Sequence, residues 1–254
     1  MLSALLLLAA CDSEPAPPAV VPEPAAPAID RVTFLTEEYP PLSYTHDGQL
    51  DGAAVALLEA VLAELGSKKT RADVSVVPWS DGYARAKSDP DTCLFSMTYT
   101  DERAPLFQWA GPISDTRIVV MARKDAGVSI DSAADLGTYT HGVFLDDIGQ
   151  QLLASAGVAA EKVRVESDAA VLMKDLAEGT IQTWAYEEAS ARFQLARAGY
   201  SVDDFETVYV LKESTTQYAF SLGTSPELIA AFSAALGSVQ ASGERQKILD
   251  AYSK

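Results

Sequence analysis

The sequence predicts an α/β protein of two lobes joined by two crossover strands. Short apolar runs rich in β-branched residues alternate with helix-like stretches, which is typical of mostly parallel sheets covered by helices. The alternation comes in two sets, which two β-rich runs at 117–123 and 217–223 separate. A chain of 254 residues that is 48% hydrophobic is also large enough for two cores of roughly 100 to 130 residues each.

The elements of the first set follow from local patterns. The stretch after Gly52 reads AAVALLEAVLAEL, a helix that Gly66 ends as its C-cap. The other elements expected in this half are a strand at 32–36, a hairpin-like turn at 45–48, a strand at 73–77, a short helix at 80–88, a strand at 93–97 and an extended stretch at 107–113.

The second set begins after the β-rich run at 117–123 and a loop at 124–131. It predicts strands at 139–143, 162–165, 181–185 and 207–211, with helices at 148–156, 168–178 and 188–198 between them. The second β-rich run, 217–223, precedes Ser225-Pro226-Glu227. Ser as N-cap and Pro in the first turn predict the start of the first of two C-terminal helices.

This order divides the body into a discontinuous first lobe and an inserted second lobe. The first lobe is expected to comprise residues 31–117 and 219–254, and the second lobe residues 118–218. The two β-rich runs would then cross between the lobes as a hinge.

Composition excludes several classes of function. The chain has 19 basic and 36 acidic residues, a net charge of −17, so its field repels nucleic acid. Two cysteines, Cys11 and Cys93, cannot build a disulfide scaffold or a four-ligand zinc site. The sequence has no HExxH, GxGxxG, GxxxxGK[ST] or GxSxG string, which argues against an obvious hydrolase or nucleotide enzyme, and we expect no metal and no cofactor.

The first thirty residues predict an anchored, extended leader. Residues 2–10 form an apolar run that is too short to span a bilayer, and LAAC at its end resembles a bacterial lipobox with Cys11 as the lipidated residue. The alternative is an apolar terminus with an incidental cysteine. Residues 12–30 hold six prolines and predict a semi-stiff tether, and Asp12 resembles a signal for retention at the inner membrane. Cys93 is then left as a buried residue without a disulfide.

Several strings in the body resemble one family in the same order. They are YPPLSY at 39–44, Gly52 at a helix start, SMTYTDER at 96–103 and FQWAGPI at 107–113. The chain resembles the periplasmic amino-acid-binding proteins of ABC importers, the extracellular solute-binding proteins of family 3. The resemblance covers residues 31–254 and implies the type II periplasmic-binding-protein fold. It also implies a small polar ligand between the lobes, most simply an amino acid, and an ABC permease as partner.

The SMTYTDER string is the most specific of these motifs. A ligand carboxylate needs a cation, and an arginine on a rigid turn supplies two parallel charge-assisted hydrogen bonds. The resemblance gives this role to Arg103 and Thr98, with Ser96 contributing contacts. Ser96 and Thr98, two residues apart on a strand end, are expected to face the same side. Without the motif, Arg103 would belong to a solvated charged turn.

The resemblance implies further site residues, each with a simpler alternative. Tyr39 corresponds to an aromatic residue that covers the ligand, or it is a core aromatic beside two prolines. Tyr186 and Glu187 correspond to ligand-facing positions, with Glu187 for the ammonium group, although an acid there also suits the first turn of a helix. Asp147 either caps a helix or faces the cleft. If Glu37 lined the cleft as well, a cationic ligand would be preferred. Of the tryptophans, Trp79, Trp109 and Trp184, only Trp79 is kept as a possible pocket wall.

These features predict a periplasmic, lipid-anchored solute-binding protein that is not an enzyme and contacts the membrane only through its anchor. Two alternatives stay open. One is an enzyme on the same scaffold, similar to arogenate or prephenate dehydratases, which would need a general acid in the cleft. The other is a ligand-sensing module for a membrane receptor.

Overall fold

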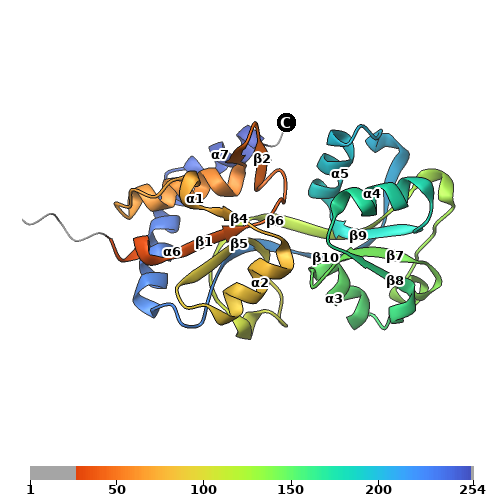
Figure 1. Ribbon diagram of the computed structural model, residues 1–254, viewed down its shortest axis with the longest axis horizontal. Coiled ribbons are helices and arrows are strands. Elements are labelled where there is room, and N and C mark those ends of the chain that lie inside the picture. Colours follow the sequence, from red (N-terminus) through yellow and green to blue (C-terminus); the bar gives the residue numbers. More distant parts are fainter. Residues whose placement is uncertain (1–26, 253–254) are drawn as a thin grey trace, which may run out of the picture.

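The computed structural model describes residues 27–252, which form two lobes side by side (Figure 1). One mixed sheet runs through both lobes in the order β4-β1-β5-β10-β6-β9-β7-β8. Its strands are β1 (Thr33–Thr36), β4 (Ser75–Val76), β5 (Thr92–Thr98), β6 (Gln108–Arg123), β7 (His141–Phe144), β8 (Val163–Glu166), β9 (Thr183–Glu187) and β10 (Phe205–Phe220). The α/β class and the two lobes predicted from the sequence are confirmed.

Helices cover the sheet in each lobe, and a small hairpin stands apart from it. The helices are α1 (Ala53–Glu64), α2 (Trp79–Ser88), α3 (Ile148–Ser155), α4 (Ala169–Glu178), α5 (Glu188–Arg197), α6 (Pro226–Ala241) and α7 (Glu244–Tyr252). The hairpin pairs β2 (Tyr44–His46) with β3 (Gln49–Asp51) around the expected turn. Asp47 and Gly48 in that turn have φ angles of 49° and 76°, which is the left-handed geometry of a tight hairpin turn.

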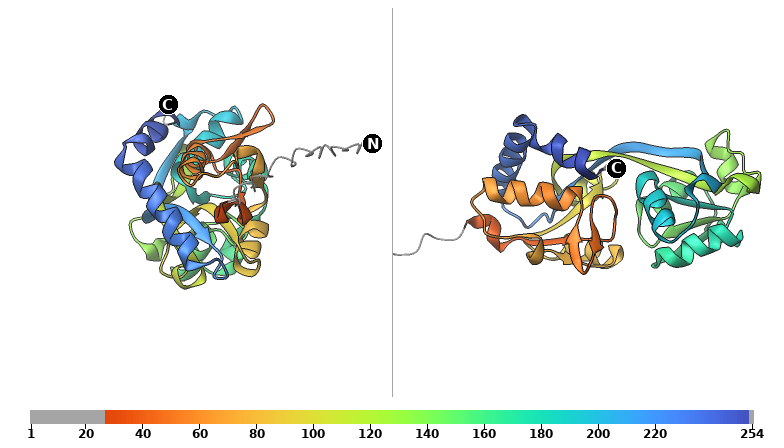
Figure 2. Two further views of the ribbon diagram at one scale, coloured as in Figure 1. Left: turned by 90° about the vertical axis from the view of Figure 1, so that its left-hand side faces the viewer. Right: turned by 90° about the horizontal axis from the view of Figure 1, so that it is seen from above.

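Two long antiparallel strands, β6 and β10, cross from one lobe to the other (Figure 2). The sequence predicted separate runs at 107–113 and 117–123, and at 207–211 and 217–223, but each pair is one 16-residue strand. The reason lies in the middle of the strands, where they leave one core and enter the next. Polar residues occupy that part, and the Ser114 and Thr216 hydroxyls lie 2.9 Å apart. The apolar pattern is therefore interrupted although the backbone ladder continues.

The predicted boundaries between the lobes, at 117/118 and 218/219, fall inside these two strands. The sheet is less parallel than the sequence predicted. The strands β4, β1 and β5 are parallel, as are β8, β7 and β9, while the pairings of β10 with β5, of β10 with β6 and of β6 with β9 are antiparallel. The crossover pair thus separates two parallel sheets, one in each lobe.

Each lobe has its own apolar core. In the first lobe, Phe34 packs against Phe220 and Phe232, and Cys93 is fully buried as a free thiol. In the second lobe, the core surrounds the fully buried Trp184. Among residues 27–252, no helix combines the length and the apolar character that crossing a bilayer requires. The predicted signal segment, the lipidation site Cys11 and nearly all of the tether lie outside the described residues.

Candidate ligand-binding site

The site lies where the parallel strands of both lobes end. Ligands of open α/β sheets bind outside the carboxyl ends of the strands, because the side chains of the following loops converge there. In this chain the residues that follow β1, β4, β7 and β8 all line one cavity between the lobes. The fold therefore brings together loops that lie far apart in the sequence.

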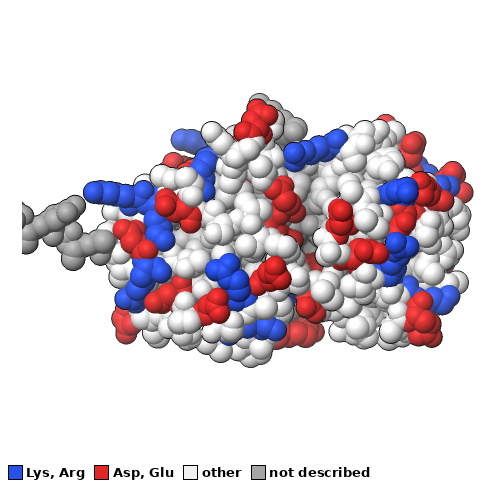
Figure 3. Space-filling model, viewed as in Figure 1, with Lys and Arg blue, Asp and Glu red and all other residues white. Residues whose placement is uncertain are grey.

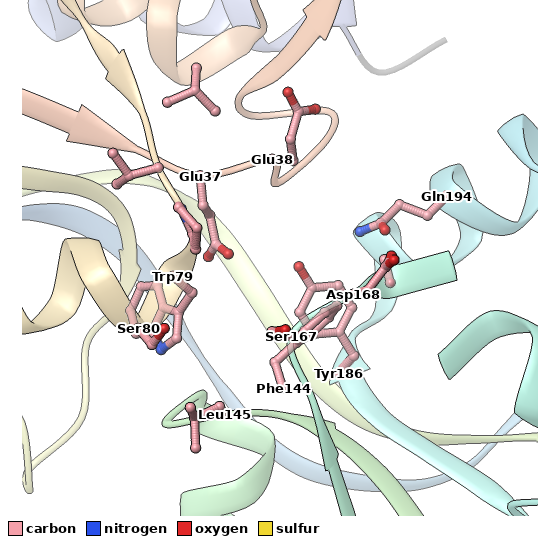
Figure 4. A pocket seen from close by; sticks show the side chains of 14 residues that line it. Glu37, Glu38, Trp79, Ser80, Phe144, Leu145, Ser167, Asp168, Tyr186 and Gln194 are labelled. Carbon is pink, nitrogen blue, oxygen red and sulfur yellow. The ribbon is translucent and has the colours of Figure 1, made fainter. Parts of the chain in front are cut away.

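The cavity has a volume of about 440 Å³, within the range of small-molecule sites. Its walls combine apolar and aromatic side chains with a few polar ones (Figure 4). The lining residues are Glu37, Glu38, Val76, Val77, Pro78, Trp79, Ser80, Phe144, Leu145, Ser167, Asp168, Ala169, Tyr186 and Gln194. Trp79 is thus a wall of the cavity, as the sequence suggested, and Tyr186 is the predicted site residue that lines it.

Direct contacts between the lobes close the site on one side. The Arg197 Nη2 donates to the Thr45 carbonyl at 3.2 Å, and the Ser190 hydroxyl donates to the Pro40 carbonyl. The rings of Tyr44 and Phe193 also meet across the boundary, with 5.4 Å between their centroids. These contacts join the loop after β1 and the β2–β3 hairpin to helix α5, so the two lobes are held together.

Arg103 lies beside the cavity rather than on its wall. Its side chain is 1% exposed and lies over the rings of Trp79 and Tyr83, with the guanidinium carbon 5.0 and 5.4 Å from their centroids. Nη1 donates to the Thr98 carbonyl at 3.3 Å, and Nε donates across the lobes to the Gln151 amide oxygen at 3.2 Å. Nη2 is buried without a hydrogen-bond partner. The protein therefore uses Nε and Nη1, and Nη2 is left for an anion.

The hydroxyls of the SMTYTDER string do not form one regular row. Ser96 has a φ angle of +63°, next to a register shift in the pairing of β5 with β10, so the strict side-to-side alternation is interrupted here. Its hydroxyl lies 3.0 Å from that of Ser43, which accepts from Thr36 at 2.8 Å. Thr98 is 3% exposed and offers its backbone carbonyl to Arg103.

Tyr39 and Tyr186 meet from opposite lobes. Their rings are 5.8 Å apart at 84°, an edge-to-face contact, and Tyr39 packs in the core of the second lobe although it follows β1. Neither hydroxyl has a hydrogen-bond partner of good geometry. Burial raises the pKa of both phenols well above the ordinary value. Two neutral phenol groups therefore stand at the junction of the lobes.

Asp147 and Glu187 serve as helix caps and are buried as well. Asp147 Oδ2 accepts from the Gly149 amide at 3.4 Å at the start of α3, and Glu187 Oε2 accepts from the Ser190 amide at 2.6 Å at the start of α5. Burial raises the pKa of both carboxyls, against the hydrogen bonds from the helix amides and, for Asp147, against the attraction of Arg103. The neighbouring Glu188 instead pairs with Arg117 and Arg192.

Glu37 is the acid that the sequence left open, and its side chain lines the cavity. Burial raises its pKa well above the ordinary value, followed by repulsion from Asp147, while Arg103 lowers it. Electrostatic coupling of this kind links a set of side chains that we call the buried ionisable cluster. It consists of the half-buried Glu37 and the buried Tyr39, Arg103, Asp147, Tyr186 and Glu187. Five of the seven residues predicted for ligand binding thus come together, while Ser96 and Thr98 lie on the β5 side.

Other cavity residues were missed by the sequence reasoning. Phe144, Ser167, Asp168 and Gln194 line the wall in the second lobe, and Gln151 holds Arg103 across the lobes. All but the two glutamines lie at or just after the carboxyl end of a predicted strand, so the rule for open α/β sheets could have found them. The glutamines lie inside helices and carry no such signal.

Comparison with known proteins supports this architecture. Residues 32–254 match the bacterial extracellular solute-binding proteins, family 3. No curated protein matches the chain. Among solved structures, a histidine kinase sensor domain with similarity to periplasmic binding proteins has a TM-score of 0.75 at 21% identity, covering 88% of this chain and 97% of that one.

Two binding proteins show the same likeness. The arginine-, lysine-, histidine-binding protein ArtJ from Geobacillus stearothermophilus has a TM-score of 0.73 at 19% identity, over 88% of this chain and 95% of its own. The substrate-binding protein of an amino acid ABC transporter has a TM-score of 0.71 at 18% identity, over 87% and 99%. At such identities the structures establish the type II periplasmic-binding-protein fold, and the match over residues 32–254 establishes the family. The chain belongs to the bacterial extracellular solute-binding proteins of family 3.

Proposed function

We propose that the protein is a periplasmic, lipid-anchored solute-binding protein that captures an amino acid between its lobes and delivers it to an ABC importer. The observation that carries this proposal is the cavity between the lobes, at the carboxyl ends of both parallel sheets, with the buried ionisable cluster beside it. Binding without chemistry suits this arrangement. The site offers charge pairing and enclosure for a small polar molecule.

The charges of the cluster complement an amino acid. The unpartnered Nη2 of Arg103 can take up a carboxylate, because a guanidinium binds carboxylates through parallel charge-assisted hydrogen bonds. Glu187 and Asp147, on the opposite lobe, can balance an ammonium group. A ligand that bridges such groups has a higher affinity for the closed arrangement than for an open one, and it therefore shifts the population toward closure.

Contacts between the lobes support a closing motion of this kind. The hydrogen bond from Arg103 to Gln151 and the bond from Ser190 to Pro40 both join residues of different lobes. The two crossover strands are the covalent links that would bend. A closed shape with the anchor at the N-terminus would be the form that a permease in the membrane recognises.

A sensory role is the second candidate, because the fold is shared with the sensor domain of a histidine kinase. Capture of the ligand would be the same, and only the partner would differ. Copurification with a permease or with a receptor kinase from membranes distinguishes these two roles.

The experiment that tests the proposed function is a thermal-shift screen of the chain after unfolding and refolding, which removes any carried ligand. The library holds the amino acids, diamines, small peptides and prephenate. A ligand at about 100 times its Kd stabilises the fold by about 2.7 kcal/mol, a shift of several degrees. A hit among the amino acids supports the proposal. No shift with any amino acid overturns it, and turnover of prephenate would favour an enzyme.

A further inference from the structure

The charged side chains that line the cavity next to the buried ionisable cluster are all negative. Three of its lining residues, Glu37, Glu38 and Asp168, are acids, and no lysine or arginine is among the lining residues. Figure 3 shows acidic side chains gathered along the boundary between the lobes on the face it displays. A ligand that enters from this side meets negative charge before it meets Arg103.

These three acids are not equivalent. Glu38 accepts hydrogen bonds from the amide and the hydroxyl of Thr45, and Asp168 accepts one from the Ala170 amide at 2.8 Å as the cap of α4. No hydrogen bond or ion pair with the described residues holds the Glu37 carboxylate. Its side chain reaches into the cavity from the first lobe (Figure 4). Glu37 is therefore the acid of this wall whose oxygens are available to a ligand.

Tyr186 adds a second, independent feature on the opposite wall. It is 2% exposed, and its hydroxyl has no hydrogen-bond partner. Figure 4 shows this hydroxyl and the Glu37 carboxylate reaching into the same space from different lobes. A phenol oxygen can accept a hydrogen bond from an ammonium or guanidinium group, and the two oxygens together can hold one such group.

The charge balance around Arg103 points in the same direction. Glu37, Asp147 and Glu187 are coupled to one another or to the same tyrosines, while Arg103 is the one cation among the described residues of the cluster. A neutral zwitterion would add one charge of each sign and leave the excess of carboxylates as it was. A ligand with a further positive charge reduces that excess, and burying paired charges costs far less than burying unpaired ones.

The rest of the cavity is apolar. Trp79, Phe144 and Leu145 line it, and the aromatic faces favour an aliphatic chain or a planar cation. We propose that the site selects a ligand whose side chain ends in a positive charge, with that charge between Glu37 and Tyr186 and its apolar stem against Trp79 and Phe144. This inference rests on the proposed function, because it assigns the side-chain end of the same ligand.

The test compares cationic ligands with neutral ligands of the same shape. Isothermal titration calorimetry on the full chain would use L-lysine against L-norleucine and L-arginine against L-citrulline. A hydrogen bond to a charged group predicts that at least one cationic ligand binds about 10- to 100-fold more tightly than its neutral counterpart. Glu37→Gln should reduce this preference to about threefold or less. Glu206→Gln, which removes the same charge from an exposed position on β10 outside the cavity wall, should retain it.

The outcomes separate this inference from the proposed function. Equal binding of norleucine and lysine, and of citrulline and arginine, would leave an amino-acid-binding protein but overturn the charge selection. A Glu37→Gln variant that keeps the full preference would also overturn it. Cadaverine, which is lysine without its carboxylate, covers the remaining case. If cadaverine binds and lysine does not, the charge selection stands and the amino acid is wrong; if no cation binds, the charge selection is wrong too.

Discussion

Replacing Arg103 tests the assignment of the ligand carboxylate most directly. The side chain is 1% exposed and makes two hydrogen bonds, to Thr98 and Gln151, so the structure holds the guanidinium in one place. Arg103→Ala removes the cation that would face the carboxylate. Arg103→Lys keeps the charge but cannot supply two parallel hydrogen bonds.

The size of the effect follows from burial. Removing one partner of a buried ion pair costs about 3–5 kcal/mol, because the other charge stays desolvated. For Arg103→Ala this corresponds to an increase in Kd of about 150- to 5000-fold. Losing one charge-assisted hydrogen bond costs about 1.5–3 kcal/mol, so Arg103→Lys should weaken binding about 10- to 150-fold.

The assay is calorimetric titration with the amino acid that gives the largest shift in the screen, together with circular dichroism to verify folding. Arg85→Ala is the matched control, since Arg85 lies on α2 with 42% of its side chain exposed and pairs with Asp89. Its affinity should equal that of the unchanged chain. If Arg103→Ala binds within about threefold of the unchanged chain, Arg103 does not hold the carboxylate and its unpartnered nitrogen binds no ligand.

Three further predictions concern the fold and the motion of the lobes. Burial raises the pKa of the three carboxyl groups of the buried ionisable cluster, so the folded state binds protons more tightly than the unfolded state. Thermal melts of the ligand-free chain should therefore show stability rising as the pH falls from neutral toward the ordinary carboxyl range. A flat profile would contradict this. Gly149→Ala would place a methyl group 2.3 Å from the Ala185 carbonyl, so urea melts should show a loss of about 2–3 kcal/mol, whereas Gly137→Ala, in open space, should change little. Ser190→Ala removes a hydrogen bond to the Pro40 carbonyl across the lobes. Without ligand, X-ray scattering should therefore show a larger radius of gyration for the variant than for the unchanged chain. An unchanged radius would mean that this bond does not hold the lobes together.

Most of the fold could be predicted because it depends on local patterns. The helix after Gly52 and the cap at Ser225 appear where the sequence places them, since both depend on neighbouring residues. The length of the crossover strands could not be predicted in the same way. Their middle residues are polar because that part lies between the two cores. A strand is recognised in a sequence by the apolar residues that face a core, so this part of each strand gives no such pattern.

The candidate site was predictable in its residue types and less so in its geometry. The resemblance named Arg103, Tyr39 and Glu187, and the structure places all three near the junction of the lobes. The availability of Glu37 depends on which acids the backbone amides already use. Which acids accept these hydrogen bonds depends on how loops from different strands pack together, and a single sequence does not predict that packing.

The insertion of the second lobe has a consequence for the order in which the chain acquires its structure. The second lobe is built from β6 to the first half of β10, one continuous stretch that supplies all of the cluster around Trp184 except Tyr39, so this core can form as soon as that stretch has emerged. The core of the first lobe needs Phe220 and Phe232, which come near the end of the chain. When the chain emerges N-terminus first, as it does on export through a membrane, the first lobe must therefore wait, with β1, β5 and α1 exposed, until α6 has followed.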